Sequence, residues 1–449
     1  GVYAVVNTLD IAGDAHFASF SHDEAIFADT LVQHVGQVMG LVVADSHKQA
    51  RVAAHGIHPT IDPLSPVLDV REALAQQLWV LPPVHVARGD PDQAIASAPH
   101  TLQGRLDVGG QEHFYLEGQV AYAIPQEGGQ WLIHSSTQHP GEVQHWVAHA
   151  LGVPLHAVRV VCRRMGGGFG GKETQAGHLA VWAALAARKV QRPVKMRLDR
   201  DDDFVITGKR HPFSYDYTVG FDDTGRIHGL NVVQLADCGH SVDLSGPVAD
   251  RAIFHTDNAY FLEHVRIDSY RCKTHKQSHT AFRGFGGPQG MIVIETIMGD
   301  IARQLGLDPL AVRQRNLYGT TDRNTTHYGT TITDNILQPL IHQLAHDCHY
   351  TQRRADIQAW NQSQPTLRRG LALTPVKFGI SFTATQFNQA GAVVHVYTDG
   401  SVLVNHGGTE MGQGLHTKVA LIVAQTLGIS AARVQVSASD TSKIPNASA

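Results

Sequence analysis

Apolar and polar residues follow two different patterns along this chain. Short apolar or alternating runs predict strands, and longer runs with apolar residues three or four positions apart predict helices. The predicted strands cover residues 2–6, 37–44, 158–161, 194–198, 215–219 and 434–437. The predicted helices cover residues 70–78, 142–151, 176–187, 290–305 and 336–348, with one more after Ser46, which can cap it. Because strands and helices are interleaved, the pattern predicts a mixed α/β and α+β chain.

A β-hairpin is predicted near the C-terminal end. Two apolar runs, 392–397 and 402–405, flank a turn that contains Asp399 and Gly400. An Asp-Gly turn between two strand-like runs is a strong short-range hairpin signal.

Proline-bearing and turn-rich stretches divide the chain, which at 449 residues is too long for one hydrophobic core. Such stretches lie at 82–99 and 362–369. We expect a small α/β unit over residues 1–80, a larger mixed unit over 98–335, and the start of a third unit over 366–449. The chain opens on Gly1 directly before a strand, so we interpret it as a partial chain, incomplete at both ends.

Composition narrows the class of protein. A formal net charge of −4 and a pI near 6.8 argue against nucleic acid or an anionic membrane as the main partner. No apolar run approaches the ~18 residues of a membrane span. The four cysteines show neither close pairing nor the spacing of a four-cysteine iron–sulfur site. We therefore expect a cytoplasmic protein whose thiols stay reduced.

Three glycine-rich loops carry the most distinctive sequence. They are RMGGGFGGKE at 164–173, RGFGGP at 283–288 and GGTEMGQG at 407–414. Glycine allows positive φ and lets a backbone approach a ligand closely. The first loop joins a predicted strand to a predicted helix, which places backbone N–H groups at a helix N-terminus, a favourable anion site.

The first loop alone also fits the dinucleotide pattern G-x-G-x-x-G through Gly166, Gly168 and Gly171. However, the next strand-end acid, Asp199, follows 28 residues after Gly171 rather than about 20. A dinucleotide fold usually needs one such loop. Three loops, two of which present a phenylalanine, favour one large ligand held from several sides; the alternative is three tight turns.

A second candidate site is a histidine cluster. His342, His346 and His349 share one face of a predicted helix, in a run that resembles the zinc pattern H-E-x-x-H. Gln343 stands where that pattern has its general base, so hydrolysis is not expected. In a chain with 29 histidines such spacing arises often by chance.

The loops and several other runs together resemble the molybdenum-cofactor subunit of the xanthine dehydrogenase family, bacterial type. The matching runs include RRMGGGFGGKE, TAFRGFGGPQG, HGGTEMGQGLHTK, GGQEHFYLEGQ, SSTQHPGE, DRDDDFVITGKRHPF, DRAIFH and KFGISFT. The resemblance extends over the whole chain. It implies a hammerhead-like α/β domain followed by molybdenum-cofactor-binding domains, the second of them incomplete.

In this family the metal is held by the dithiolene of a pterin, so the protein contributes hydrogen bonds and shape. The resemblance implies that Gln138 bonds the metal's oxo ligand, and that Phe169 and Arg283 line the metal through their backbones. The cofactor-binding residues so implied are Gln138, Gly168, Phe169, Gly170, Arg283, Gly412 and Gln413.

The resemblance also implies a substrate pocket. Phe285 and Phe382 match two rings that clamp a flat heterocycle, one face-on and one edge-on, and Thr383 matches a neighbouring contact. Glu173 and Arg251 match two charged residues that hold a purine and act in catalysis. From the residues alone, the phenylalanines would be core residues and Arg251 a surface arginine.

The implied reaction converts hypoxanthine and xanthine to urate, through attack by a metal-bound hydroxyl and hydride transfer to a sulfido ligand. The family's general base is a glutamate outside this chain. Electrons would pass to 2Fe-2S clusters and FAD in a partner subunit, with NAD as acceptor. The implied assembly is a dimer of heteromers that includes the remaining C-terminal part of the molybdenum subunit.

Two other functions stay open. One is an aldehyde oxidase of the same family, which would lack the charged pair matching Glu173 and Arg251. The other is a non-catalytic cofactor-binding subunit, because the chain lacks the family's C-terminal glutamate.

Overall fold

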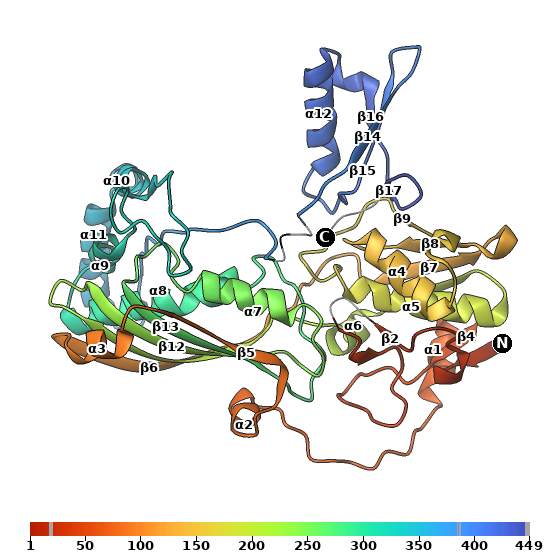
Figure 1. Cartoon of the computed structure of the whole chain (residues 1–449), viewed down its shortest axis with the longest axis horizontal. Helices are drawn as coiled ribbons and strands as arrows, with labels where there is room; N and C mark the ends of the chain where they lie inside the picture. The colour runs from red at the N-terminus through yellow and green to blue at the C-terminus, as the bar shows by residue number, and fades with distance from the viewer. Residues whose placement is uncertain (18–20, 384, 386–387, 445–449) are drawn as a thin grey trace.

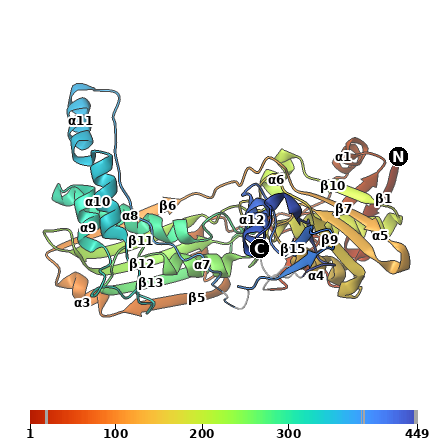
Figure 2. The same ribbon diagram turned by 90° about the horizontal axis from the view of Figure 1, so that it is seen from above.

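The structure is a computed structural model that describes residues 1–17, 21–383, 385 and 388–444. Two lobes, each built on a five-stranded sheet, lie side by side, and a small unit near the C-terminal end projects from between them (Figures 1 and 2). Residues 79–108 and 213–272 supply the strands of the first lobe's sheet, and residues 120–197 and 439–440 supply those of the second, so neither sheet is formed by one continuous segment. The predicted mixed α/β, multidomain architecture is confirmed.

The sheet of the first lobe carries the larger hydrophobic core. Its strands, in order across the sheet, are β5 (Trp79–Arg88), β13 (His264–Cys272), β12 (Ile227–Asp237), β11 (Phe213–Phe221) and β6 (His100–Val108). Only β12 and β13 are parallel. On β11, Phe213, Tyr215, Tyr217 and Val219 recur at alternate positions in the core that β11 shares with a long helix, α8. This alternation explains why the strand forms where the sequence predicted one.

Helices cover both faces of this sheet. α7 and α8 pack on the core side and lead toward the second lobe, whereas α2 and α3 lie on the opposite face (Figure 1). A helical hairpin, α10 and α11, stands away from the lobe (Figure 2). The helices are α2 (Val70–Ala75), α3 (Pro91–Ala96), α7 (Ser245–Phe254), α8 (Gly287–Leu305), α9 (Pro309–Asn316), α10 (Leu337–Asp347) and α11 (Tyr350–Ser363).

The second lobe is a smaller sheet covered by two helices on one face. Its strands, in order, are β10 (Val194–Arg197), β7 (Val120–Pro125), β8 (Trp131–Ser135), β9 (Val158–Cys162) and β17 (Ser439–Asp440), and its helices are α4 (Pro140–Leu151), α5 (Gln175–Val190) and, at its edge, α6 (Arg200–Ile206). The first thirteen residues of α5, 175–187, are all buried. Small residues make this possible: a Cβ on Gly177 would lie 2.4 Å from the ring of Trp146 on α4.

The N-terminal segment packs against the second lobe. It contains β1 (Val2–Val6), β2 (His16–Phe17), β3 (Glu24–Ala25), β4 (Leu41–Ala44) and α1 (His47–His55). Ser46 caps α1 as predicted, accepting a hydrogen bond from the Gln49 amide. The predicted strand at 37–44 is wrong in its first half. Its partner β1 ends at Val6, opposite Leu41, so residues 37–40 have no strand to pair with.

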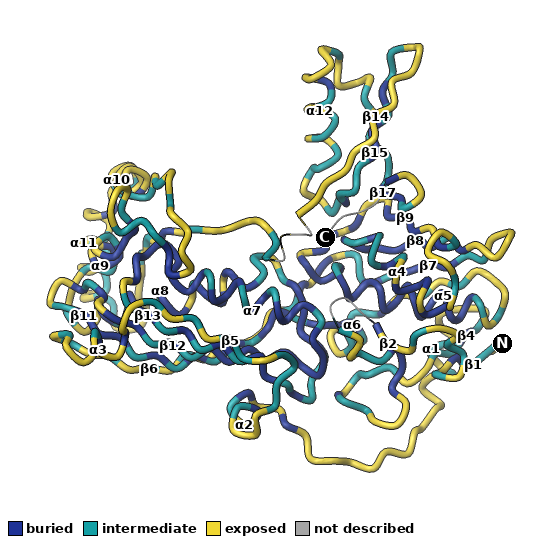
Figure 3. The backbone as a smooth tube through the Cα atoms, in the orientation of Figure 1, coloured by how far each residue is buried: buried dark blue, intermediate teal, exposed yellow. Residues whose placement is uncertain are grey.

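The linker between α1 and α2, the residues of and after α11, and much of the unit near the C-terminal end are exposed (Figure 3). That unit, residues 392–436, contains the predicted hairpin. It consists of β14 (Ala392–Val396), β15 (Val402–His406), α12 (Leu415–Leu427) and β16 (Val434–Val436). No helix in the described part of the chain is long and apolar enough to cross a membrane. All four cysteines have free thiols.

Candidate active site

The first glycine-rich loop, between β9 and α5, is built around the side chain of Gln138. Its Oε1 accepts hydrogen bonds from the amides of Gly170 (2.9 Å) and Lys172 (3.3 Å). A Cβ on Gly168 would lie 2.5 Å from the same oxygen, so only glycine fits there. Gly170 and Phe169 both have positive φ, at 94° and 56°. Gln138 is buried, and its carbonyl holds the loop, which leaves the amide nitrogen as the donor of this side chain.

A buried lysine that the sequence analysis did not select supports the same loop. Lys172 is fully buried, and its Nζ donates to the Glu117 carbonyl (2.7 Å) and to Ser136 Oγ (2.9 Å). The Glu117 carboxylate accepts from the Gly166 amide (2.6 Å) and lies 3.6 Å from Lys172 Nζ. Burial lowers the pKa of Lys172 to about 8. The pair fixes both ends of the glycine run, although nothing in the local pattern marks it.

Backbone hydrogen bonds join the three glycine-rich loops. The Arg283 amide donates to the Phe169 carbonyl (2.9 Å), which ties the second loop to the first. The Met165 amide donates to the Glu410 carbonyl (2.9 Å), which ties the first loop to the third. The predicted residues Gln138, Gly168, Phe169, Gly170 and Arg283 therefore lie in one connected region.

The third loop is closed by hydrogen bonds between its own side chains and its backbone. The Glu410 carboxylate accepts from the amides of Gly412 (2.9 Å) and Gly414 (3.1 Å). The amide group of Gln413 bonds its own loop, from Nε2 to the Thr409 carbonyl (2.9 Å) and from the Met411 amide to Oε1 (2.7 Å). A contact from Gln413 to a pterin would thus require its side chain to exchange these partners or the backbone to act instead.

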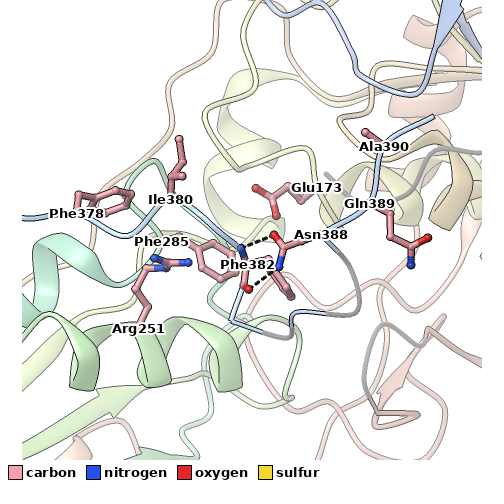
Figure 4. A pocket seen from close by; sticks show the side chains of 10 residues that line it. Glu173, Arg251, Phe285, Phe378, Ile380, Phe382, Asn388, Gln389 and Ala390 are labelled. Atoms are coloured by element: carbon pink, nitrogen blue, oxygen red, sulfur yellow. Dashed lines mark hydrogen bonds between the residues drawn. The ribbon is translucent and has the colours of Figure 1, made fainter. Parts of the chain in front are cut away.

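Beside the loops lies a cavity of about 580 Å³. Four of the predicted substrate residues line it, and each comes from a different segment: Glu173 precedes α5, Arg251 lies on α7, Phe285 is in the second loop and Phe382 is in the segment after α11. In Figure 4, Arg251 lies to the left of the ring pair and Glu173 lies above it. The remaining lining residues are Gly284, Phe378, Ile380, Asn388, Gln389 and Ala390. Thr383, also predicted, is the neighbour of Phe382 but does not line the cavity.

Arg251 is 5 % exposed, so the alternative of a surface arginine is wrong. Its two terminal nitrogens donate to the carbonyls of Gly379 and Ser381. A guanidinium has five N–H donors, so each of these nitrogens keeps one more for a ligand. The Nε is buried and has no hydrogen-bond partner in the described part of the chain. Burial lowers the pKa of Arg251, which nonetheless remains a cation at neutral pH.

Glu173 is a carboxyl group that holds its proton near neutral pH. Burial, followed by the nearby carboxylates of Asp243 and Glu142, raises the pKa of Glu173 to about 8. A protonated carboxyl can both donate and accept a hydrogen bond. The cavity therefore offers a cationic donor, Arg251, and a neutral donor–acceptor, Glu173.

The two predicted clamp rings touch each other. The ring centroids of Phe285 and Phe382 are 5.4 Å apart and the planes are tilted by 50°. Phe285 has a φ of 48°, a strained conformation for a non-glycine residue, which the adjoining glycines accommodate. Whether one ring meets a ligand face-on and the other edge-on stays a prediction.

Sequence reasoning did not select Phe378 and Ile380, two cavity residues close to Phe382, although the sequence carries a signal for them. Phe378, Ile380 and Phe382 stand at alternate positions, and all three line the cavity although they form no strand. The Phe378 ring lies close enough to Gly287 that a Cβ there would be 2.5 Å away. The available signal was the alternation of these large apolar residues with Gly379 and Ser381, which indicates that one side of the segment is in contact with something.

The histidine cluster does not form a site. In the described residues no group of three or more His, Cys, Asp or Glu side chains is arranged to hold a metal ion. His346 is largely exposed and pairs with Asp347 instead.

Comparison with known proteins identifies three matching family models. Two are described as "Molybdopterin cofactor-binding domain" and match residues 75–317 and 343–449. The third, "Aldehyde oxidase and xanthine dehydrogenase, a/b hammerhead domain", matches residues 1–62.

Among curated proteins, the chain is 42 % identical to the xanthine dehydrogenase/oxidase of Gallus gallus, over all of this chain and 33 % of that protein. It is also 42 % identical to xanthine dehydrogenase 1 of Arabidopsis thaliana, over 98 % of this chain and 32 % of that protein. The chain thus spans about a third of the length of these relatives.

Among solved structures, the chain is similar to the aldehyde oxidoreductase of Desulfovibrio gigas, with a TM-score of 0.84 and 23 % identity, over all of this chain and 51 % of that one. It is also similar to quinoline 2-oxidoreductase from Pseudomonas putida 86, with a TM-score of 0.82 and 24 % identity, over all of this chain and 60 % of that one. At this identity the likeness establishes the fold.

Proposed function

Because this chain belongs to the molybdopterin cofactor-binding domain family, we propose that it is the molybdenum-binding part of a xanthine dehydrogenase that oxidises hypoxanthine and xanthine to urate. The observation that carries the proposal is one cavity lined by Arg251, Glu173 and two phenylalanine rings in contact, beside the joined glycine-rich loops. The 40–43 % identity to xanthine dehydrogenases over essentially the whole chain supports it.

The residues around the first loop fit a pterin-held molybdenum. Gln138 is buried and its Oε1 accepts from the loop amides, so its Nε2 is the group that suits an oxo ligand, and Gly168 and Gly170 leave room that a Cβ would fill. We assign Gln138, Phe169 and Arg283 to the metal's surroundings, and Gly168, Gly170, Gly412 and Gln413 to the pterin. When bound, this group supplies the oxygen-transfer and two-electron redox chemistry.

The side chains of the cavity bind and polarise the purine. Phe285 and Phe382 hold a flat ring through their faces and edges. Arg251 donates to a ring carbonyl oxygen that gains negative charge as the ring carbon is attacked, an interaction that strengthens in the transition state. Glu173, protonated near neutral pH, donates to or accepts from a ring nitrogen or oxygen. In this proposal the general base is a glutamate outside this chain.

The remainder of the proposal concerns the assembly. Electrons leave to 2Fe-2S clusters and FAD in a partner subunit, with NAD as acceptor, in a cytoplasmic dimer of heteromers. Within this chain we assign residues 1–80 to the hammerhead-like domain, 98–335 to the first cofactor-binding domain and 366–449 to the start of the second.

The test is Arg251→Met in the native assembly, with steady-state kinetics on xanthine and on an aromatic aldehyde, normalised to molybdenum content. An aldehyde has no distant oxygen for Arg251 to hold. We expect xanthine turnover to fall by about 10²–10³, the usual cost of one such donor, while aldehyde oxidation is retained.

A matched control separates substrate binding from anchoring, because Arg251 also holds the carbonyls of Gly379 and Ser381. Lys377 anchors the same segment through Asp257 (2.6 Å) but does not line the cavity. Lys377→Met should leave the xanthine-to-aldehyde ratio unchanged. If Arg251→Met and Lys377→Met behave alike, or both substrates suffer equally, the purine assignment fails.

A further inference from the structure

The segment 376–390, of which the structure describes residues 376–383, 385 and 388–390, supplies six of the residues that line the cavity: Phe378, Ile380, Phe382, Asn388, Gln389 and Ala390. Its first half is fixed to the end of α7 and the residues that follow. The Gly379 amide donates to His255 Nε2 (3.1 Å), and the Lys377 amide donates to Asn258 Oδ1 (3.2 Å). Arg251 on α7 adds bonds to the carbonyls of Gly379 and Ser381, so α7 and the residues after it hold the segment from Lys377 to Ser381.

The backbone of Phe382 is held by the side chain of Asn388. The Phe382 amide donates to Asn388 Oδ1 (2.8 Å), and Asn388 Nδ2 donates to the Phe382 carbonyl (2.9 Å) (Figure 4). The Asn388 side chain and backbone also bond the Thr385 carbonyl, at 3.3 and 3.0 Å. Both backbone polar groups of Phe382 are therefore bound by one amide.

Only asparagine suits this arrangement. The contact needs one acceptor and one donor at a fixed separation on a short side chain, which a planar carboxamide provides. Aspartate would keep the acceptor for the Phe382 amide but lose the donor, and alanine would lose both. Asn388 and the Phe382 ring that it positions both line the cavity.

We propose that Asn388 is a positioning residue that determines specificity for flat bicyclic substrates by fixing Phe382 against Phe285. This inference rests on the proposed function of the cavity. A ring that must contact a fused bicycle together with a second ring needs an accurately placed backbone, since a misplacement of about 1 Å can cost about 10²-fold in rate. A small monocyclic aldehyde makes less use of the second ring and tolerates its displacement.

The experiment compares Asn388→Ala and Asn388→Asp with a matched control, Asn361→Ala, in the native cofactor-loaded assembly. Asn361 makes the same two-bond contact to the backbone of Arg369, at 2.8 and 3.0 Å, but at the end of α11 away from the cavity. The readouts are kcat and KM for xanthine and for an aromatic aldehyde, together with molybdenum content.

We expect Asn388→Ala to lower kcat/KM for xanthine by about tenfold to 10²-fold and to change the aldehyde value less than about twofold. Asn388→Asp should fall between wild type and Asn388→Ala, and Asn361→Ala should match wild type on both substrates. Equal losses on both substrates, loss of molybdenum, or a result indistinguishable from Asn361→Ala would overturn the proposal.

The proposed function is judged separately, by whether the wild-type assembly oxidises xanthine at all. If it does not, Asn388 is tested by equilibrium dialysis of xanthine against the wild type and both Asn388 variants. A dissociation constant raised about tenfold by Asn388→Ala, and not by Asn361→Ala, would then support the positioning role, and an unchanged constant would reject it.

Discussion

Glu173 responds to pH in the direction opposite to a paired surface carboxylate. Its pKa is raised from 4.5 to about 8, first by burial, so the folded protein holds this proton more tightly than the unfolded chain. The resulting stabilisation is complete below the unfolded pKa and is lost as the pH rises through about 8. Glu173→Gln keeps the shape and cannot ionise.

We therefore predict that Glu173→Gln makes unfolding less sensitive to alkaline pH. The melting temperature of the wild type should fall relative to the variant between pH 5 and pH 9, by about 2–4 °C for each kcal/mol of effect. Glu127→Gln, at an exposed turn, is the control and should track the wild type. Parallel pH curves for wild type and Glu173→Gln would mean that the carboxyl is ionised in the folded protein.

At the residue scale, the sequence identified Glu173 and Arg251 only through their resemblance to a family. Their neighbours in the sequence suggested exposed side chains. Burial depends on segments that are distant in the chain: the Arg251 guanidinium bonds residues 379 and 381. Lys172 was missed for the same reason. A lysine beside glycines looks like a surface residue until Glu117, 55 positions earlier, supplies its partners.

The first glycine-rich loop, as an element, has one position at which a single methyl group should matter. A Cβ on Gly168 would lie 2.5 Å from Gln138 Oε1, whereas a Cβ on Gly109 would meet nothing within 4 Å. We predict that Gly168→Ala lowers molybdenum and pterin content by about 10–100-fold, the usual effect of disturbing the support of a metal site, and that Gly109→Ala does not. Metal analysis and the fluorescence of released pterin measure this. Full cofactor content in Gly168→Ala would show that the loop can shift freely.

His255 gives the segment 376–390 a pH dependence of its own. Its Nδ1 lies 3.0 Å from the Arg251 carbonyl and so carries the hydrogen, while its Nε2 accepts from the Gly379 amide. Only the neutral ring can do both, and burial lowers the pKa of His255 accordingly. The stabilisation that His255 gives this segment is therefore present above 6.5, the ordinary pKa of histidine, and is lost as the pH falls below that value. We expect KM for xanthine to rise at acid pH in the wild type, and His255→Asn, which retains an acceptor, to flatten that rise.

Elements with a strong apolar period were predictable, and those defined by a partner were not. The helix predicted at 176–187 is found at 175–190, because an alanine-rich run that is buried on all sides leaves little choice. The strand predicted at 37–44 begins only at Leu41, where β1 offers a partner. The alternating run from Phe378 to Phe382 has no neighbouring strand, so it remains an irregular segment across the cavity.

Across the whole molecule, burial is uneven. In the unit at residues 392–436, β14 is exposed throughout and Ala424 is the one buried residue of α12, whereas residues 175–187 of α5 are all buried. Low burial predicts low local stability. In the isolated chain, amides of β14 and α12 should exchange with deuterium at least about tenfold faster than those of α5, and in the native assembly the difference should shrink. Equal exchange rates in the isolated chain would contradict this.

The backbone bond between Met165 and Glu410 also sets a time order for making the site. The two residues are 245 positions apart. At a synthesis rate of about 5–20 residues per second, the first loop leaves the ribosome about 10–50 seconds before the third. Gln138 and the glycines of the first loop can fold in that interval, but the bond from Met165 to Glu410 cannot form yet. Contacts between such distant residues form slowly even in a finished chain. The open side of the loop is thus available for a cofactor until the last of the three segments arrives.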